Sequence, residues 1–391
     1  MIKDGFMYIA VLVFTAALIV LLPGLFRGRW AKRFFGFVPP VVLIYLGLMT
    51  MCTLKLWDLE ATSTAYGSIK NPLLYAMLFI MLLRCDLRKM LVLGPKMLLG
   101  FFAAAVSIGL GFVVVFSIMK GVLGEEAWKP FGALCGSWMG GGGNMLAVQA
   151  ALDIDESMMA YALVMDSVCG MLYVMFLLWA VGFPEKFNRW TRADTRAIDA
   201  VGSSLEREAR SDNRRLSWQN IILLVGMGLF AAALCSKLGE LAGGAVTFFD
   251  KTTWTVLFVT VLGILLAMTP LGRLKGTEEV SNVLLYIVIA LIASRADLSA
   301  MGNAPAWLLA GVLVLVVHAV IMVVLAKLFR LDIFTCAVAS LANIGGTATA
   351  PVLAGAYSSA LVPVGVIMAL LGYVVGTGGG LVVAQIMSML A

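Results

Sequence analysis

Long apolar runs with very few charged positions recur along the whole chain. They cover residues 5–22, 38–57, 97–119, 157–181, 218–239, 305–326 and 361–390. An α-helix needs about 20 apolar residues to cross the hydrocarbon layer of a bilayer, and it satisfies its own backbone hydrogen bonds there. The pattern therefore predicts an all-α polytopic membrane protein.

The composition agrees with this class. Hydrophobic residues make up 62% of the 391 residues and charged residues 13%, and the mean hydropathy is +1.00. Because a soluble domain carries about 25% charged residues, a soluble protein is excluded. The six cysteines lie in or beside apolar runs without a CxxC pair, so they indicate neither a disulfide framework nor a zinc site.

The charges in the loops predict an orientation. Segments 23–36 and 84–96 are basic, and the linker 183–217 holds eight basic and six acidic residues, whereas 153–156 is acidic. Basic loops stay in the cytoplasm, so we expect a multi-pass membrane protein with its N-terminus outside. The net charge of +6 follows from this loop pattern and does not indicate nucleic-acid binding.

Four short matches in the same order suggest that the chain contains two copies of one plan. They pair 14–18 with 230–234, 45–48 with 261–264, 84–87 with 295–298, and 137–144 with 340–347. We predict a first repeat at 1–182, the cytoplasmic linker at 183–217 and a second repeat at 218–391. The alternative is that apolar sequence of low complexity matches itself by chance.

Counting crossings in the first repeat requires one segment that enters the membrane and returns. Predicted helices at 5–22, 38–57, 71–84, 97–119 and 157–181 agree with the loop charges only if 131–152 is such a re-entrant hairpin. Its four consecutive glycines, Gly140 to Gly143, disfavour a helix by roughly 1 kcal/mol each relative to alanine. Five crossings are an odd number, so the second copy is inverted, with its hairpin at 333–356. The fold prediction is two inverted-topology repeats of about five crossing helices plus one re-entrant hairpin each, an arrangement typical of secondary transporters.

The two glycine-rich tips are the predicted site. Backbone N–H groups at a half-helix start attract anions, carbonyls at a half-helix end hold cations, and glycine lets a ligand approach closely. The predicted solute-binding residues are Ser137, Gly141, Gly142, Gly143, Asn144, Asn343, Gly345, Gly346 and Thr347. The predicted ion ligands are Asp166, Gln149, Ser340 and Thr349, since hard cations prefer oxygen ligands. The alternative is close helix packing through small residues.

Four other polar features allow two interpretations each. Asp166 is the one acid well inside a long apolar run, where a carboxylate is costly and usually functional; it could instead be a hydrogen-bonded structural acid. His318, the only histidine, could relay protons, although a packed neutral side chain is the simpler interpretation. The pairs Arg84 with Asp86 and Arg295 with Asp297 fit interfacial anchors or local salt bridges. The remaining Trp, Tyr and Met residues fit packing or lipid-facing roles.

An enzyme is not expected. The chain contains no HExxH motif, CxxC pair or P-loop. Ser137 with His318 could imitate an intramembrane serine protease, but the sequence around Ser137 lacks the GxSG turn. We expect no cofactor beyond a coupling sodium ion and no metal site beyond that ion.

The two tips, Ser137 to Asn144 and Asn343 to Pro351, resemble those of domain-of-unknown-function family 819, bacterial membrane proteins, over nearly the whole chain. More distantly, the layout is similar to the sodium/glutamate symporters and the 2-hydroxycarboxylate transporters, which carry a glycine-glycine-x-glycine motif at each tip. Gly140 to Gly143 match this motif, whereas Gly345-Gly346 is followed by Thr347-Ala348. The resemblance implies a protein of the bacterial inner membrane, sodium coupling, and a homodimer in which a core moves against a rigid scaffold. It places scaffold helices at about 5–57 and 218–270, and the core at about 71–182 and 281–391.

The sequence thus predicts a sodium-coupled, elevator-type secondary transporter of a small polar organic solute, such as an amino acid, a short peptide or a monocarboxylate. The hairpins contain no basic residue, which argues against a multiply charged anion. One alternative is a cation/proton antiporter that uses Asp166. The alternative from another class is a membrane sensor or scaffold that transports nothing.

Overall fold

The computed structural model describes residues 1–26, 40–193, 216–245, 251–297, 304–357 and 361–391, together with single positions between them. Regular structure in these ranges is helical apart from one β-bridge between Ile2 and Trp57. Half of the predicted basic loop 23–36 and most of the linker 183–217 lie outside the described residues.

Apart from the short α5 and α10 of the first half, the described helices of the two halves follow one order: three helices, a long helix, two short helices joined by a break, and another long helix. The first half contains α1 (Gly5–Leu25), α3 (Pro40–Thr53), α4 (Ser63–Leu82), α5 (Leu87–Leu91), α6 (Gly94–Leu123), α7 (Trp128–Gly140), α8 (Gly142–Ala151), α9 (Glu156–Ala180) and α10 (Pro184–Thr191). The second half contains α12 (Trp218–Ala245), α13 (Lys251–Ala267), α14 (Thr277–Ala293), α15 (Ala304–Phe329), α16 (Ile333–Ile344), α17 (Gly346–Tyr357) and α18 (Val362–Ser388).

Among the described residues, seven helices are long and apolar enough to cross a membrane: α1, α4, α6, α9, α12, α15 and α18. The prediction of an all-α polytopic membrane protein is confirmed. One boundary differs, because α4 begins at Ser63 and not near residue 71. Its polar first half is compatible with the helix because Lys70 pairs with Glu156 at 3.5 Å.

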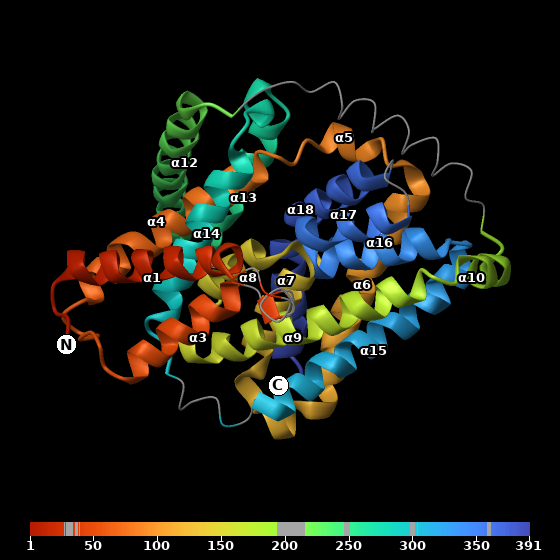
Figure 1. The fold of residues 1–391 in the computed structure, drawn as a ribbon, viewed down its shortest axis with the longest axis horizontal. Coiled ribbons are helices and arrows are strands. Elements are labelled where there is room, and N and C mark those ends of the chain that lie inside the picture. The colour runs from red at the N-terminus through yellow and green to blue at the C-terminus, as the bar shows by residue number, and fades with distance from the viewer. Residues whose placement is uncertain are drawn as a thin grey trace.

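The helices form two groups with a pair of short helices between them (Figure 1). One group contains α1, α3, α4, α12, α13 and α14, and within it α4 packs against α12, α13 and α14. The other contains α6, α9 and α15 to α18, with α6 packed on α15. Helices α7 and α8 lie in the middle of the view, where α8 contacts both α4 and α18.

A pair of glycine stripes joins α7 to α18. Gly132, Gly136 and Gly140 on α7, and Gly372, Gly376 and Gly380 on α18, are spaced by four residues, so each set shares one helix face. A Cβ added to Gly376 would lie 2.8 Å from the Gly136 carbonyl oxygen and 2.8 Å from Gly140 Cα. The two helices therefore pack backbone against backbone, as small residues permit in membrane proteins.

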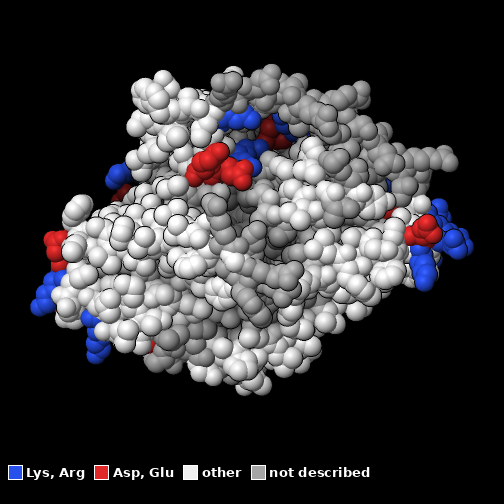
Figure 2. Space-filling model, in the orientation of Figure 1, with Lys and Arg blue, Asp and Glu red and all other residues white. Residues whose placement is uncertain are grey.

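The surface fits a bilayer environment. Figure 2 shows Lys, Arg, Asp and Glu at the left and right ends and in the upper middle of this face, with a broad uncharged area below and between them. Large apolar side chains are exposed on the long helices, for example Ile118 at 73% and Phe230 at 71%. Exposed apolar surface of this extent is expected for helices that face lipid.

Candidate functional site

Each predicted hairpin segment consists of two short helices that pack on each other, α7 with α8 and α16 with α17. Helix α7 has 13 residues, which at about 1.5 Å per residue is roughly 20 Å and shorter than the ~30 Å hydrocarbon layer. The expectation that all four glycines interrupt the first hairpin was too broad. Gly140 still ends α7 and Gly142 already begins α8, because the turn needs a single residue with positive φ, Gly141 at 87°.

Both tips lie against one turn of α18. A Cβ on Gly141 would lie 3.4 Å from Cε1 of Tyr373, and the Tyr373 hydroxyl is 2.9 Å from Oγ1 of Thr347 at the second tip. A Cβ on Gly372 would lie 2.7 Å from the Met139 carbonyl oxygen and 3.3 Å from that of Ala342. One tyrosine and its neighbour thus touch both hairpins.

Open space adjoins the start of the second helix in each hairpin. A Cβ added to Gly142 or Gly346 would meet no heavy atom within 4 Å. Gly346 has a φ of 58°, so it makes the positive-φ turn in the second hairpin that Gly141 makes in the first. By contrast, a Cβ on Gly143 would lie 2.8 Å from Sδ of Met81 on α4, so this glycine serves close packing.

Asn144 and Asn343 differ in how their side chains are used. Asn144 is buried; its Nδ2 donates to the Gly140 carbonyl oxygen at 2.6 Å, and its Oδ1 accepts from Thr377 Oγ1 at 2.6 Å. This side chain therefore ties the first tip to α18. Asn343 donates through Nδ2 to the Ala339 carbonyl oxygen at 2.9 Å, while its buried Oδ1 has no partner among the described residues.

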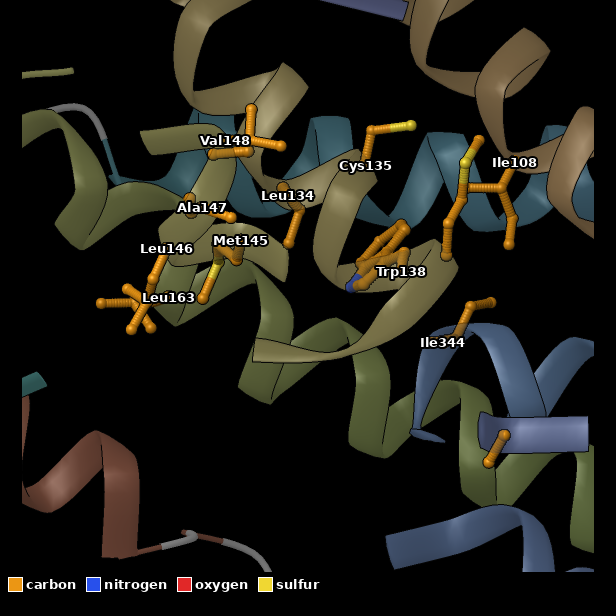
Figure 3. Packing of buried hydrophobic residues seen from close by; sticks show 14 of the residues in the cluster. Ile108, Leu134, Cys135, Trp138, Met145, Leu146, Ala147, Val148, Leu163 and Ile344 are labelled. Carbon is orange, nitrogen blue, oxygen red and sulfur yellow. The ribbon is translucent and has the colours of Figure 1, made fainter. Parts of the chain in front are cut away.

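Asp166, on α9, faces the first hairpin. Its Oδ1 accepts hydrogen bonds from Trp138 Nε1 at 2.9 Å and from Ser137 Oγ at 3.2 Å. Figure 3 shows Trp138 within the packed apolar cluster that also contains Ile344 of the second hairpin. Within the described residues no lysine or arginine pairs with this carboxylate. Because its fixed partners are neutral, the carboxylate can take a cation or a proton.

The other three predicted ion ligands lie in separate surroundings. Ser340 Oγ is 3.1 Å from His318 Nε2. Thr349 lies beside Gly345, where an added Cβ would overlap its hydroxyl. Gln149 is buried, and neither of its amide atoms has a partner in the described chain. Among the described residues, no hydrogen bond joins any two of Asp166, Gln149, Ser340 and Thr349.

His318 is fully buried and uses both ring nitrogens. Nδ1 is 2.7 Å from Ser107 Oγ, and Nε2 is 3.1 Å from Ser340 Oγ. The ring therefore links α15 to α6 and to α16. This geometry favours the interpretation of His318 as a packed, hydrogen-bonded residue over a proton relay.

Arg84 is paired differently from the sequence-based expectation. It forms an ion pair with Glu278 at 2.9 Å, while Asp86 pairs with Arg88 at 2.9 Å. The short α5 turns Arg88 back onto its own cap residue, and the Arg88 hydrogen bond lowers the pKa of Asp86 below its usual value. Arg84 and Glu278 lie close enough to Tyr373 to interact with it electrostatically, so a basic residue does stand near the tips.

Sequence reasoning missed three residues that the structure puts at the hairpins: Trp138, Tyr373 and Thr377. The two aromatic residues had been assigned to packing or lipid contact. A signal for α18 was nevertheless present, because glycines recur every four residues from Gly372 to Gly380, the spacing of a helix–helix contact.

Comparison with known proteins matches nearly the whole chain to one family. Residues 10–390 match the family described as "Protein of unknown function (DUF819)". The "Uncharacterized membrane protein YjcL" of Bacillus subtilis (strain 168) is 23% identical over 364 residues, which cover 90% of this chain and 89% of that protein.

Proposed function

The chain belongs to the DUF819 family, and from this premise we propose that it is a sodium-coupled secondary transporter of a small polar organic solute and not an enzyme. One observation carries the proposal. Two half-helices, α8 and α17, begin at Gly142 and Gly346, where open space adjoins the backbone, and Tyr373 touches both tips.

The chemistry of the tips suits one carboxylate. The first N–H groups of an α-helix have no acceptor inside the helix and carry a partial positive charge, so they bind anions. Asn144 N and Met145 N both donate to the Gly141 carbonyl oxygen, which leaves the N–H groups of Gly142 and Gly143 for a ligand. We therefore favour an amino acid, a short peptide or a monocarboxylate.

Sodium coupling rests on Asp166. The carboxylate lies directly behind the first hairpin through Ser137 and Trp138, so an ion bound to it could control the position of that hairpin. The distant resemblance to sodium/glutamate symporters supports an elevator-type mechanism in a homodimer of the bacterial inner membrane, with the N-terminus outside. In that mechanism the core, at about 71–182 and 281–391, would move against the scaffold helices at about 5–57 and 218–270.

Two other functions remain as alternatives. A cation/proton antiporter is favoured by the lack of a cationic partner for Asp166 among the described residues, and it would move ions without an organic solute. A sensor or scaffold would show no flux and would tolerate changes at the tips.

The test begins with purified protein and thermal-shift measurements against amino acids, dipeptides and short monocarboxylates, each with and without sodium. We expect at least one such compound to raise the melting temperature more in sodium than in potassium. The stabilising compound is then used for uptake into proteoliposomes. Flux of protons or sodium without any organic solute would instead establish the antiporter, and no flux of either kind would support the sensor.

Gly142→Val should block solute binding without loss of folded protein. No protein atom lies within 4 Å of the added Cβ, so the side chain enters only the space assigned to the solute. We expect solute-dependent stabilisation and uptake to fall by at least about 10-fold, the effect of roughly 1.4 kcal/mol.

Gly226→Val is the matched control, because Gly226 on α12 is exposed and also has open space at its Cβ position. It should leave binding and uptake unchanged. If Gly142→Val still binds the solute normally, the solute does not bind at the first tip.

A further inference from the structure

A cavity that is open to the surface lies away from the hairpin tips. It has a volume of about 440 Å³ and is bordered by the end of α9, by α10 and by α15 and α16. Aromatic and aliphatic side chains dominate its walls, among them Phe176, Trp179, Phe187, Trp190, Met322 and Ile333. The volume lies within the range of about 300–1,000 Å³ that is usual for small-molecule sites.

Polar groups are few in this lining, with Tyr173 and Ser340 among them. Of the lining residues that the structure describes, Lys186 is the one with a charge. Ser340 is almost fully buried, and its hydroxyl is bonded to His318. The walls offer a polar metabolite few hydrogen-bond partners, so such a ligand would lose hydration without compensation. A hydrocarbon chain would gain free energy with every methylene that it buries.

Helix α10 is a fixed wall of the cavity. The Ile333 backbone N–H, at the start of α16, donates to Asn188 Oδ1 at 2.9 Å. Lys327 donates to the Trp190 carbonyl oxygen, and its ammonium lies 4.8 Å from the centre of the Trp190 ring. Contacts to α15 and α16 therefore hold α10 over the cavity.

The surroundings of α10 are basic. Among the described residues here, Lys186, Arg189, Arg192, Lys327 and Arg330 are all exposed, against one exposed acid, Glu185. The nearby Asp332 is buried and caps α16 by accepting from Thr335. Figure 2 shows Lys and Arg together with Asp or Glu at the end of the molecule where α10 lies in Figure 1. Basic groups beside an apolar cavity match the phosphate and the acyl chain of an anionic lipid.

We propose that this cavity binds one anionic phospholipid, with an acyl chain between α9, α15 and α16 and the phosphate beside Lys186 and α10. The bound chain would contact Cys336 and Ala337 on α16, and thus one arm of the second hairpin. The proposal is independent of the transport function, because it needs neither a solute at the tips nor an ion at Asp166.

Native mass spectrometry of the purified full-length protein tests this site. After removal of lipid, the protein receives phosphatidylglycerol or phosphatidylcholine with identical acyl chains. We expect one phosphatidylglycerol to remain bound at concentrations at which phosphatidylcholine does not. Lys186→Gln should lower this headgroup preference about fivefold, the effect of roughly 1 kcal/mol per basic residue near a lipid surface.

A cavity-filling variant tests the acyl-chain part of the site separately from the headgroup part at Lys186. Ala319→Phe places a ring in the cavity and should abolish retention of phosphatidylglycerol. Val320→Phe, at the next position of α15, is the control because Val320 is 58% exposed and outside the lining. Equal retention of both lipids by the unmodified protein, or unchanged retention in Ala319→Phe, would overturn the proposal.

Discussion

Replacing Asp166 with asparagine should abolish sodium-dependent stabilisation and coupled transport while folded protein remains in the membrane. The amide keeps an oxygen acceptor for Ser137 and Trp138, which bond to Oδ1 of Asp166 at 3.2 and 2.9 Å. Only the negative charge is lost, so the hairpin should keep its position on α9. Losing a charged ligand costs about 3 kcal/mol, which is roughly 100-fold in ion affinity.

The measurement needs no knowledge of the solute, because the shift in melting temperature between sodium and potassium buffers reports the ion directly. Trp138→Phe is the matched control: it removes one hydrogen bond to the same carboxylate and retains the charge. We expect this variant to show a smaller sodium response, but not its loss. If Asp166→Asn keeps the full response, the carboxylate is structural and the ion must bind elsewhere.

Gly376→Ala should destabilise the protein strongly, although it adds a single methyl group. That Cβ would lie 2.8 Å from the Gly136 carbonyl oxygen and from Gly140 Cα, and 2.9 Å from Cγ of Asn144. The first two atoms belong to the backbone, and the Asn144 side chain is held by two hydrogen bonds. These atoms cannot yield on their own, so α7 must move away from α18. Overpacking of this kind costs about 1–3 kcal/mol and occasionally more, and we expect Gly376→Leu to yield no folded protein.

Gly378→Ala, two residues along the same helix, provides the comparison. Gly378 is exposed, and its Cβ position is open, so alanine should be neutral or stabilising by up to about 1 kcal/mol, the difference in helix propensity. The measurement is the melting temperature of both purified variants in the same detergent. Similar melting temperatures for the two would show that α7 and α18 are less closely packed than the glycine stripes indicate.

The features that could be predicted from the sequence are those that depend on residues close together in the chain. Twenty apolar positions in a row define a membrane helix whatever it packs against, and the class was accordingly right. The breaks between the paired short helices also lie within the predicted glycine-rich tips, because Gly141 and Gly346 adopt the positive φ that glycine allows without strain.

The errors and omissions concern partners that are distant in the chain. Arg84 was paired with Asp86 by proximity, whereas its partner Glu278 comes from the other half. In the sequence, Tyr373 is one of several aromatic residues within an apolar run. Only the fold shows that it lies against Thr347 and Gly141. No local pattern distinguishes these positions, because their roles arise from contacts between the two halves.

The contact between α7 and α18 also sets an order for biogenesis. Helix α7 ends at Gly140, and α18 begins at Val362, about 220 residues later. At roughly 5–20 residues per second of synthesis, the first glycine stripe waits on the order of 10–45 s before its partner leaves the ribosome. During that interval the hairpin must be shielded by lipid, by the insertion machinery or by temporary neighbours, so the first half cannot reach its final packing alone.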